Sequence, residues 1–299
     1  MYLVPCAFSL SMLSNLKIKI GGITTAVEWT AGQFEFTAPR AYKPFISDGR
    51  ADLRLALHRG APELELGKKC FDSPPIWSLY RNGDASAVKL FDSFLDLKRL
   101  LVVAFQFRQA ALYFTEPNGR FINPFFGPGM ELLMINYLVQ GNGVIIHAGG
   151  IDHNGKGMLF TGESGAGKST LANLWDREKG VDVLSDDRTI VRYVDGEFRM
   201  YGTPWHGEAK FGSPRGVKLE KIYFLRHSQK NATQPLTRVQ SVLKMLQCSF
   251  PPYWDPAGME FTMGLFEKLA THIPCNELAF RPDASAIANV ETDLILGER

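Results

Sequence analysis

The chain has few cysteines and almost no net charge, and both shortages exclude classes of protein. Its 299 residues include four cysteines, and no two of them are spaced as a Cys-x-x-Cys metal pair. Widely separated cysteines in a chain of this length favour a reducing compartment, so we expect a cytoplasmic protein. A formal net charge of +2 gives no electrostatic reason to expect nucleic acid as a partner.

Long hydrophobic runs are also missing, so we expect no membrane-spanning helix. The most apolar stretch, 100–114, is interrupted by Gln106, Arg108 and Gln109, and is shorter than the roughly 20 residues that such a helix needs. It is typical of two buried strands around a turn. No basic residue precedes the apolar segment 1–6, so a secretory signal is not expected either.

Short alternating segments predict that the first part of the chain is mostly β. Residues 16–20 and 53–57 alternate apolar and polar side chains, which is the period of a half-buried strand. Segment 77–91 has the pattern of a hairpin around the turn Asn82-Gly83. Strands of this kind indicate a small antiparallel sheet.

A stretch rich in glycine and proline, 118–129, suggests where the chain divides. We predict a β-rich N-terminal domain over 1–128 and an α/β nucleotide-binding domain over 129–299. The second domain begins with the pattern of a buried helix over 130–139, followed by a strand over 144–148.

Residues 162–169 are the most informative stretch, because they match the phosphate-binding pattern G-x-x-x-x-G-K-[ST] at every fixed position. An apolar strand is predicted before them and a helix after them. Backbone N–H groups and the positive end of the helix dipole would then converge on a phosphate. The alternative, a glycine-rich turn that binds nothing, does not require this strand and helix. The residues expected to bind the nucleotide are Gly162, Glu163, Ser164, Gly165, Ala166, Gly167, Lys168, Ser169 and Thr170.

A second polar group follows the loop at a spacing that allows one helix and one strand. Segment 181–187 is an apolar strand that ends in Asp186 and Asp187. Mg²⁺ prefers oxygen ligands near the phosphates, and the Ser169 hydroxyl and a carboxylate would supply them. Adjacent residues on a strand point to opposite sides, so one aspartate could serve the metal and the other the substrate. An acidic turn between strands is the alternative. ATP and Mg²⁺ are therefore the expected cofactors.

Two further parts of the chain are candidates for the same site. His147 lies in the strand before the loop, and a hairpin over 152–155 would bring it close, although a histidine in an apolar strand is often a core residue. Segment 202–207, with Lys210 and Arg215 after it, would either contact the substrates or form a solvated surface loop. Segment 250–254 is expected to be a structural anchor between two final helices that pack on the sheet.

The order and spacing of His147-Ala148-Gly149-Gly150, the segment 157–169 and Ser185-Asp186-Asp187 resemble the HPr serine kinase family. This family belongs to the phosphoenolpyruvate carboxykinase-like group of phosphate-loop proteins, and the resemblance covers about 147–224. It implies an α/β fold with a mixed sheet. It also implies that Asp186 is the general base, that Asp187 binds magnesium with Ser169, and that His147 is a catalytic neighbour.

Two departures from the family pattern affect the expected acceptor. Thr170 stands where members that act on HPr carry glutamate, and segment 202–207 replaces an Arg-Gly-Leu-Gly type sequence. The pattern more closely resembles uncharacterised kinase-like relatives, some of which accompany peptide-maturation gene cassettes. We therefore expect ATP- and magnesium-dependent phosphoryl transfer to a serine-type hydroxyl of a protein, peptide or small molecule. A nucleotide-binding regulatory or assembly module is the alternative. The sequence leaves open the acceptor, the choice between ATP and GTP, and whether the chain forms a homo-oligomer.

Overall fold

The computed structural model describes residues 13–32, 37–60, 62, 65–92, 97–104, 107–114 and 128–296. The chain forms two compact units, one over 1–19 and 23–137 and the other over 20–22 and 138–299. Helix α1 (Gly129–Leu138), which the sequence predicts as a buried helix, is counted almost entirely with the first unit. The connection predicted over 118–129 falls mostly outside the described residues. No helix within the described ranges is both long and apolar enough to cross a membrane.

The first unit contains, within its described residues, an eight-stranded sheet with the order β1-β2-β3-β8-β7-β6-β5-β4. The hairpin expected around Asn82-Gly83 is present between β5 and β6, and 100–114 does hold two strands, β7 and β8. The strands are β1 (Leu13–Ile20), β2 (Ile23–Thr30), β3 (Leu53–Arg59), β4 (Lys68–Ser73), β5 (Trp77–Asn82), β6 (Ala85–Asp92), β7 (Leu97–Ala104) and β8 (Gln109–Phe114).

The expectation of an antiparallel sheet is wrong for this unit, because β3 runs parallel to both β2 and β8. A tight hairpin turn forces two strands to be antiparallel, whereas a long connection can return the chain to the same end of the sheet. The connection over 31–52 between β2 and β3 is of the long kind and carries a 3-10 helix, Arg40–Phe45.

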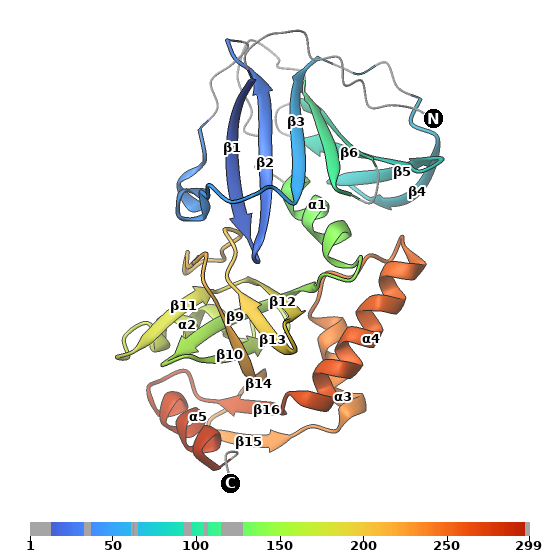
Figure 1. The fold of residues 1–299 in the computed structure, drawn as a ribbon. Helices are drawn as coiled ribbons and strands as arrows, with labels where there is room; N and C mark the ends of the chain where they lie inside the picture. Colours follow the sequence, from blue (N-terminus) through green and yellow to red (C-terminus); the bar gives the residue numbers. More distant parts are fainter. Residues whose placement is uncertain are drawn as a thin grey trace. The chain divides into compact units, whose positions relative to one another are not determined.

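The second unit is a mixed sheet with helices, as the sequence predicts (Figure 1). Strand β10 pairs antiparallel with β9 and parallel with β14, and β14 pairs parallel with β16. The strands are β9 (Val144–His153), β10 (Lys156–Thr161), β11 (Val181–Ser185), β12 (Arg188–Val194), β13 (Glu197–Tyr201), β14 (Gly216–His227), β15 (Ala232–Pro235) and β16 (Cys275–Phe280). The helices are α2 (Lys168–Trp175), α3 (Arg238–Gln247), α4 (Pro256–His272) and α5 (Ser285–Leu296).

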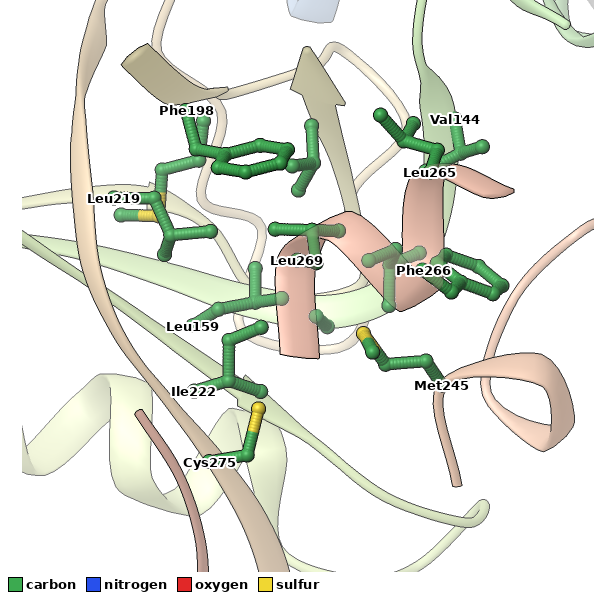
Figure 2. Close-up of a cluster of buried hydrophobic side chains, with 14 of the residues drawn as sticks. Val144, Leu159, Phe198, Leu219, Ile222, Met245, Leu265, Phe266, Leu269 and Cys275 are labelled. Carbon is green, nitrogen blue, oxygen red and sulfur yellow. The ribbon is translucent and has the colours of Figure 1, made fainter. Parts of the chain in front are cut away.

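Apolar side chains cover both faces of this sheet, because successive residues of a strand point to opposite sides. On β10, Leu159 belongs to a buried cluster with α3 and α4, which Figure 2 shows around Met245 and Phe266. Phe160, the next residue, belongs to a second cluster with α2 and α5. The expectation that the final helices pack on the sheet is confirmed for α3 and α4.

The hairpin between β9 and β10 sets the entry to the phosphate loop. Asn154 and Gly155 connect the strands with φ values of 54° and 85°, which is the backbone geometry of a two-residue turn that matches strand twist. The turn fixes the register, so that Thr161 at the end of β10 lies opposite Ala148, next to His147. The pairing of β9 with β10 therefore places His147 near the start of the loop, as predicted.

A buried polar network holds α5 against the sheet. The Asp293 carboxylate lies 2.5 Å from Lys221 Nζ, and it accepts hydrogen bonds from the hydroxyls of Tyr223 at 2.8 Å and Thr233 at 2.9 Å. Burial raises the pKa of Asp293, but the hydrogen bonds from Lys221, Tyr223 and Thr233 outweigh burial and hold the pKa below its usual range. The carboxylate is therefore stabilised in its charged form.

Replacing Asp293 with alanine is expected to lower the free energy of unfolding by about 3 kcal/mol, because the buried Lys221 would lose its carboxylate partner. In the wild type this contribution should be complete above the unfolded pKa of about 3.9 and be lost as pH falls through the lower folded value. Urea unfolding from pH 7 to pH 3 measures both effects. Glu260→Ala, at an exposed carboxylate of α4, is the control and should stay within about 0.5 kcal/mol.

Candidate active site

The phosphate loop follows β10 and ends where α2 begins at Lys168, which confirms the predicted order of strand, loop and helix. Gly165 and Gly167 have φ values of 81° and 98°, a region that residues with a Cβ rarely adopt. A Cβ on Gly167 would also lie 2.5 Å from the Phe280 ring. Glycine is thus required at position 167 both by the backbone conformation and by close packing.

Lys168 is buried, and its side chain contacts the backbone of the phosphate loop. Its Nζ donates hydrogen bonds to the carbonyl oxygens of Gly162 and Glu163, each at 2.9 Å. Desolvation by burial lowers the pKa of Lys168, and the nearby Cys248 and Asp187 offset this only in part. A buried ammonium held by two carbonyl oxygens is suited to accept a phosphate as an additional partner.

A cavity of about 350 Å³ lies against the loop and brings together most of the predicted site residues. Gly162, Glu163 and Ala166 do not line it; they line a neighbouring cavity of about 400 Å³. The residues that line the first cavity are His147, Ser164, Gly165, Gly167, Lys168, Ser169, Thr170, Asp186, Asp187, Gly207 and Glu208.

Asp186 is almost fully buried at the base of this cavity, with an exposed fraction of 1%. Its carboxylate accepts hydrogen bonds from the backbone N–H groups of Gly207 at 3.0 Å and Ala209 at 2.9 Å. The Ser169 hydroxyl donates to the same carboxylate at 3.3 Å. The loop serine therefore bonds to Asp186, whereas the family resemblance pairs it with Asp187.

Both aspartates lie just after the strand, which corrects the expectation that they are part of it. β11 ends at Ser185, and the Ser185 hydroxyl accepts hydrogen bonds from the backbone N–H groups of Asp187 and Arg188. These bonds bend the chain before β12 begins. The bend, rather than strand alternation, sets the directions of the two carboxylates.

Asp187 is less buried and forms a pair with His147. The distance from His147 Nε2 to Asp187 Oδ1 is 2.8 Å, and the Arg188 guanidinium donates to the other carboxylate oxygen. Burial raises the pKa of Asp187, but the hydrogen bond from His147 and the charge of Arg188 outweigh it and hold the pKa below its usual range. β9 and β12 bring the pair together, because His147 lies opposite Arg188 in their register.

The sequence did not indicate that Phe250 belongs to this site. Its ring centroid lies 5.0 Å from the Arg188 guanidinium carbon and 6.2 Å from the centre of the His147 ring. The segment after α3 reaches β9, where His147 N donates to Cys248 O and Phe250 N donates to Ile145 O. This long-range contact has no local sequence signal. Phe250 is an anchor, as predicted, but it anchors the His147 side of the cavity.

Segment 202–207 contacts the site, whereas Arg215, which follows it, does not. The segment reaches the site through the backbone N–H of Gly207, and neither Trp205 nor His206 lines the cavity. The Arg215 guanidinium forms ion pairs with Asp152 at 3.0 Å and Asp182 at 2.8 Å, and Arg215 does not line the cavity. Of the two alternatives for these residues, contact with the substrates is therefore not supported for Arg215.

Comparisons with known proteins give little beyond this geometry. No protein-family model matches the chain, and no curated protein matches it. Among solved structures, the chain is similar to an HPr(Ser) kinase/phosphatase from Coxiella burnetii, with 13% sequence identity and a TM-score of 0.30. The match covers 52% of this chain and 99% of that chain. The relationship is distant.

Proposed function

We propose that the protein transfers a phosphoryl group from ATP, with Mg²⁺, to a serine-type hydroxyl of a protein, peptide or small molecule. One observation carries the proposal: a phosphate loop and two aspartates with different partners line the same cavity. Asp186 bonds to the loop serine, and Asp187 bonds to His147. Phosphoryl transfer needs a metal site near the phosphates and a separate group near the acceptor, and the two aspartates supply one each.

The donor atoms around Ser169 fit magnesium. The Ser169 hydroxyl and the Asp186 carboxylate are both oxygen donors, the ligand type that Mg²⁺ prefers. No group of three or more His, Cys, Asp or Glu side chains with metal-binding geometry occurs among the described residues. Mg²⁺ commonly uses one or two carboxylates together with water and substrate phosphates. An ion held by Ser169 and Asp186 would neutralise charge on the phosphates.

We assign the general base to Asp187 and the metal to Asp186 with Ser169, which reverses the roles implied by the family resemblance. Backbone N–H groups hold the Asp186 carboxylate in place, and one of its oxygens lies 3.3 Å from the Ser169 hydroxyl, so its position suits a fixed metal ligand. Asp187 is partly exposed in the cavity, where an acceptor hydroxyl would reach it, and its lowered pKa keeps it ionised at neutral pH. His147 acts as a positioning residue that holds this carboxylate.

The acceptor hydroxyl gives its proton to Asp187 while its oxygen forms a bond to the γ-phosphorus of ATP. The bond from the γ-phosphorus to the bridging oxygen breaks, and ADP leaves. Lys168 and the loop N–H groups hold the phosphates in line for this displacement. We also propose that the nucleotide-binding domain is of the phosphoenolpyruvate carboxykinase-like type.

The experiment that tests the function is transfer of labelled γ-phosphate from ATP, in the presence of Mg²⁺, to proteins and peptides encoded by neighbouring genes. The expected result is a labelled phosphoserine on one acceptor. Tight nucleotide binding without acceptor-dependent transfer would instead support a regulatory or assembly module. A lack of nucleotide binding would contradict both functions.

Replacing Gly207 with alanine is expected to reduce phosphate transfer at least tenfold without unfolding the protein. A Cβ at this position would lie 2.8 Å from Asp186 Oδ2 and 3.2 Å from Asp187 Cβ, so a carboxylate must move. Displacements of about 1 Å in a catalytic group commonly cost large factors in rate. Steady-state transfer assays and thermal unfolding measure the two effects.

The matched control is Gly264→Ala in α4, where an added Cβ meets no atom within 4 Å. This change should leave transfer unaltered and stabilise the helix by up to about 1 kcal/mol. Equal transfer by the Gly207 variant and the wild type would show that the placement of Asp186 does not matter for the reaction.

A further inference from the structure

His227 has an unusual position beside the phosphate loop. It is the last residue of β14, and its Nε2 lies 2.8 Å from the carbonyl oxygen of Gly165. One side of its ring stacks on Phe280, with 5.5 Å between ring centres and an interplanar angle of 28°. The residue is nevertheless exposed. The contacts with Gly165 and Phe280 therefore fix an aromatic ring next to the loop while leaving much of it accessible to solvent.

The strand order places His227 on the side of the loop away from the two aspartates. β10 has β9 as its neighbour on one side, and β9 carries His147, the partner of Asp187. On the other side β10 pairs with β14, which in turn pairs with β16, and these three strands are parallel. Ligands of α/β proteins bind beyond the carboxyl ends of such strands. His227 and Phe280 end β14 and β16, and they lie opposite each other in register.

The direction of the bound nucleotide follows from this arrangement. The γ-phosphate must lie toward Ser169 and the aspartates, because transfer occurs there in the proposed function. The nucleoside is at the other end of the triphosphate, so it extends toward the ends of β14 and β16. The cavity of about 400 Å³ that His227 lines adjoins the first cavity, since Ser164 and Gly165 line both.

We propose that the nucleoside of the phosphoryl donor stacks on the ring of His227. The hydrogen bond to Gly165 and the stacking on Phe280 then act together, because they hold the imidazole at a fixed position relative to the phosphates. Every base has a flat π-face, so stacking of this kind binds the donor without strong selection among purines. This proposal rests on the proposed function and adds to it the residue that binds the nucleoside.

Two substitutions distinguish stacking of the nucleoside on His227 from support of the phosphate loop by the hydrogen bond to Gly165. His227→Phe keeps an aromatic ring but loses the hydrogen bond to Gly165, whereas His227→Gln keeps a hydrogen-bond donor but loses the ring. Calorimetry in Mg²⁺ with ATP and with inorganic triphosphate, which has no nucleoside, gives the affinities. We expect His227→Gln to weaken ATP binding on the order of tenfold, with triphosphate binding unchanged. His227→Phe should bind ATP about as tightly as the wild type.

The opposite pattern would overturn the proposal. If His227 only supports the loop, His227→Phe would lose affinity for ATP and triphosphate equally, and His227→Gln would bind both normally. Thermal unfolding of each variant shows whether a loss of binding reflects a loss of folding. A wild-type protein that binds neither ATP nor triphosphate would contradict the proposed function itself, and this inference with it. If the wild type binds both ATP and triphosphate, and His227→Gln does not lose affinity specifically for ATP, the inference is contradicted but the proposed function is not.

Discussion

Replacing Asp187 with asparagine is expected to reduce phosphate transfer by a factor of about 10²–10⁴ while leaving ATP affinity nearly unchanged. General-base catalysis contributes factors of this size, and asparagine has the same shape but cannot accept the proton. Asp187 is suited to the role because it is ionised, partly exposed in the cavity, and held by His147 at 2.8 Å. Single-turnover transfer and calorimetric titration with ATP measure the two quantities separately.

Asp186→Asn is the matched comparison, because it makes the same exchange of a carboxylate oxygen for an amide nitrogen at the adjacent residue. Its effect should appear mainly as a weaker apparent affinity for Mg²⁺, since Asp186 lies beside the Ser169 hydroxyl. Raising the Mg²⁺ concentration should therefore restore part of the activity of Asp186→Asn and none of the activity of Asp187→Asn. Transfer at the wild-type rate by Asp187→Asn would contradict its assignment as the base.

Replacing Lys168 with alanine is expected to weaken ATP binding by about 30- to 100-fold. Hydrogen bonds to charged groups contribute roughly 1.5–3 kcal/mol, and the ammonium is the buried cation of the loop. The change also leaves the carbonyl oxygens of Gly162 and Glu163 without this donor, so the loop is expected to lose some order. Calorimetry with ATP and Mg²⁺ gives the affinity.

Lys179→Ala is the control for charge alone, because Lys179 is exposed shortly after α2. Its ATP affinity should equal that of the wild type at physiological salt, where exposed charges are screened. Unchanged affinity in the Lys168 variant would show that the loop does not bind the phosphates, and every role assigned to the cavity would then fail.

The parts of the fold that the sequence predicted are those with local signals. The turn Asn82-Gly83, the turn at Asn154-Gly155 and the loop ending at Lys168 each depend on a few adjacent residues with restricted backbone geometry. The prediction that His147 lies near the loop also followed locally, because a two-residue turn fixes the register of the hairpin.

The parts that could not be predicted depend on contacts between distant segments. The parallel pairing of β3 with β2 and β8 follows from a long connection whose path has no sequence pattern. The N–H groups that bind Asp186 come from Gly207 and Ala209, which approach it only in the folded chain. The sequence identified both aspartates, but their different partners, and hence their proposed roles, follow from the bend after Ser185.

The most direct test of this account is a crystal structure of the protein with Mn²⁺ in place of Mg²⁺ and a non-hydrolysable ATP analogue. Anomalous scattering locates the metal without ambiguity. The account predicts phosphates within the loop, the metal bound by the Ser169 hydroxyl and the Asp186 carboxylate, and Asp187 facing the γ-phosphate from the acceptor side. A metal held by Asp187, or an analogue bound outside the loop, would contradict it.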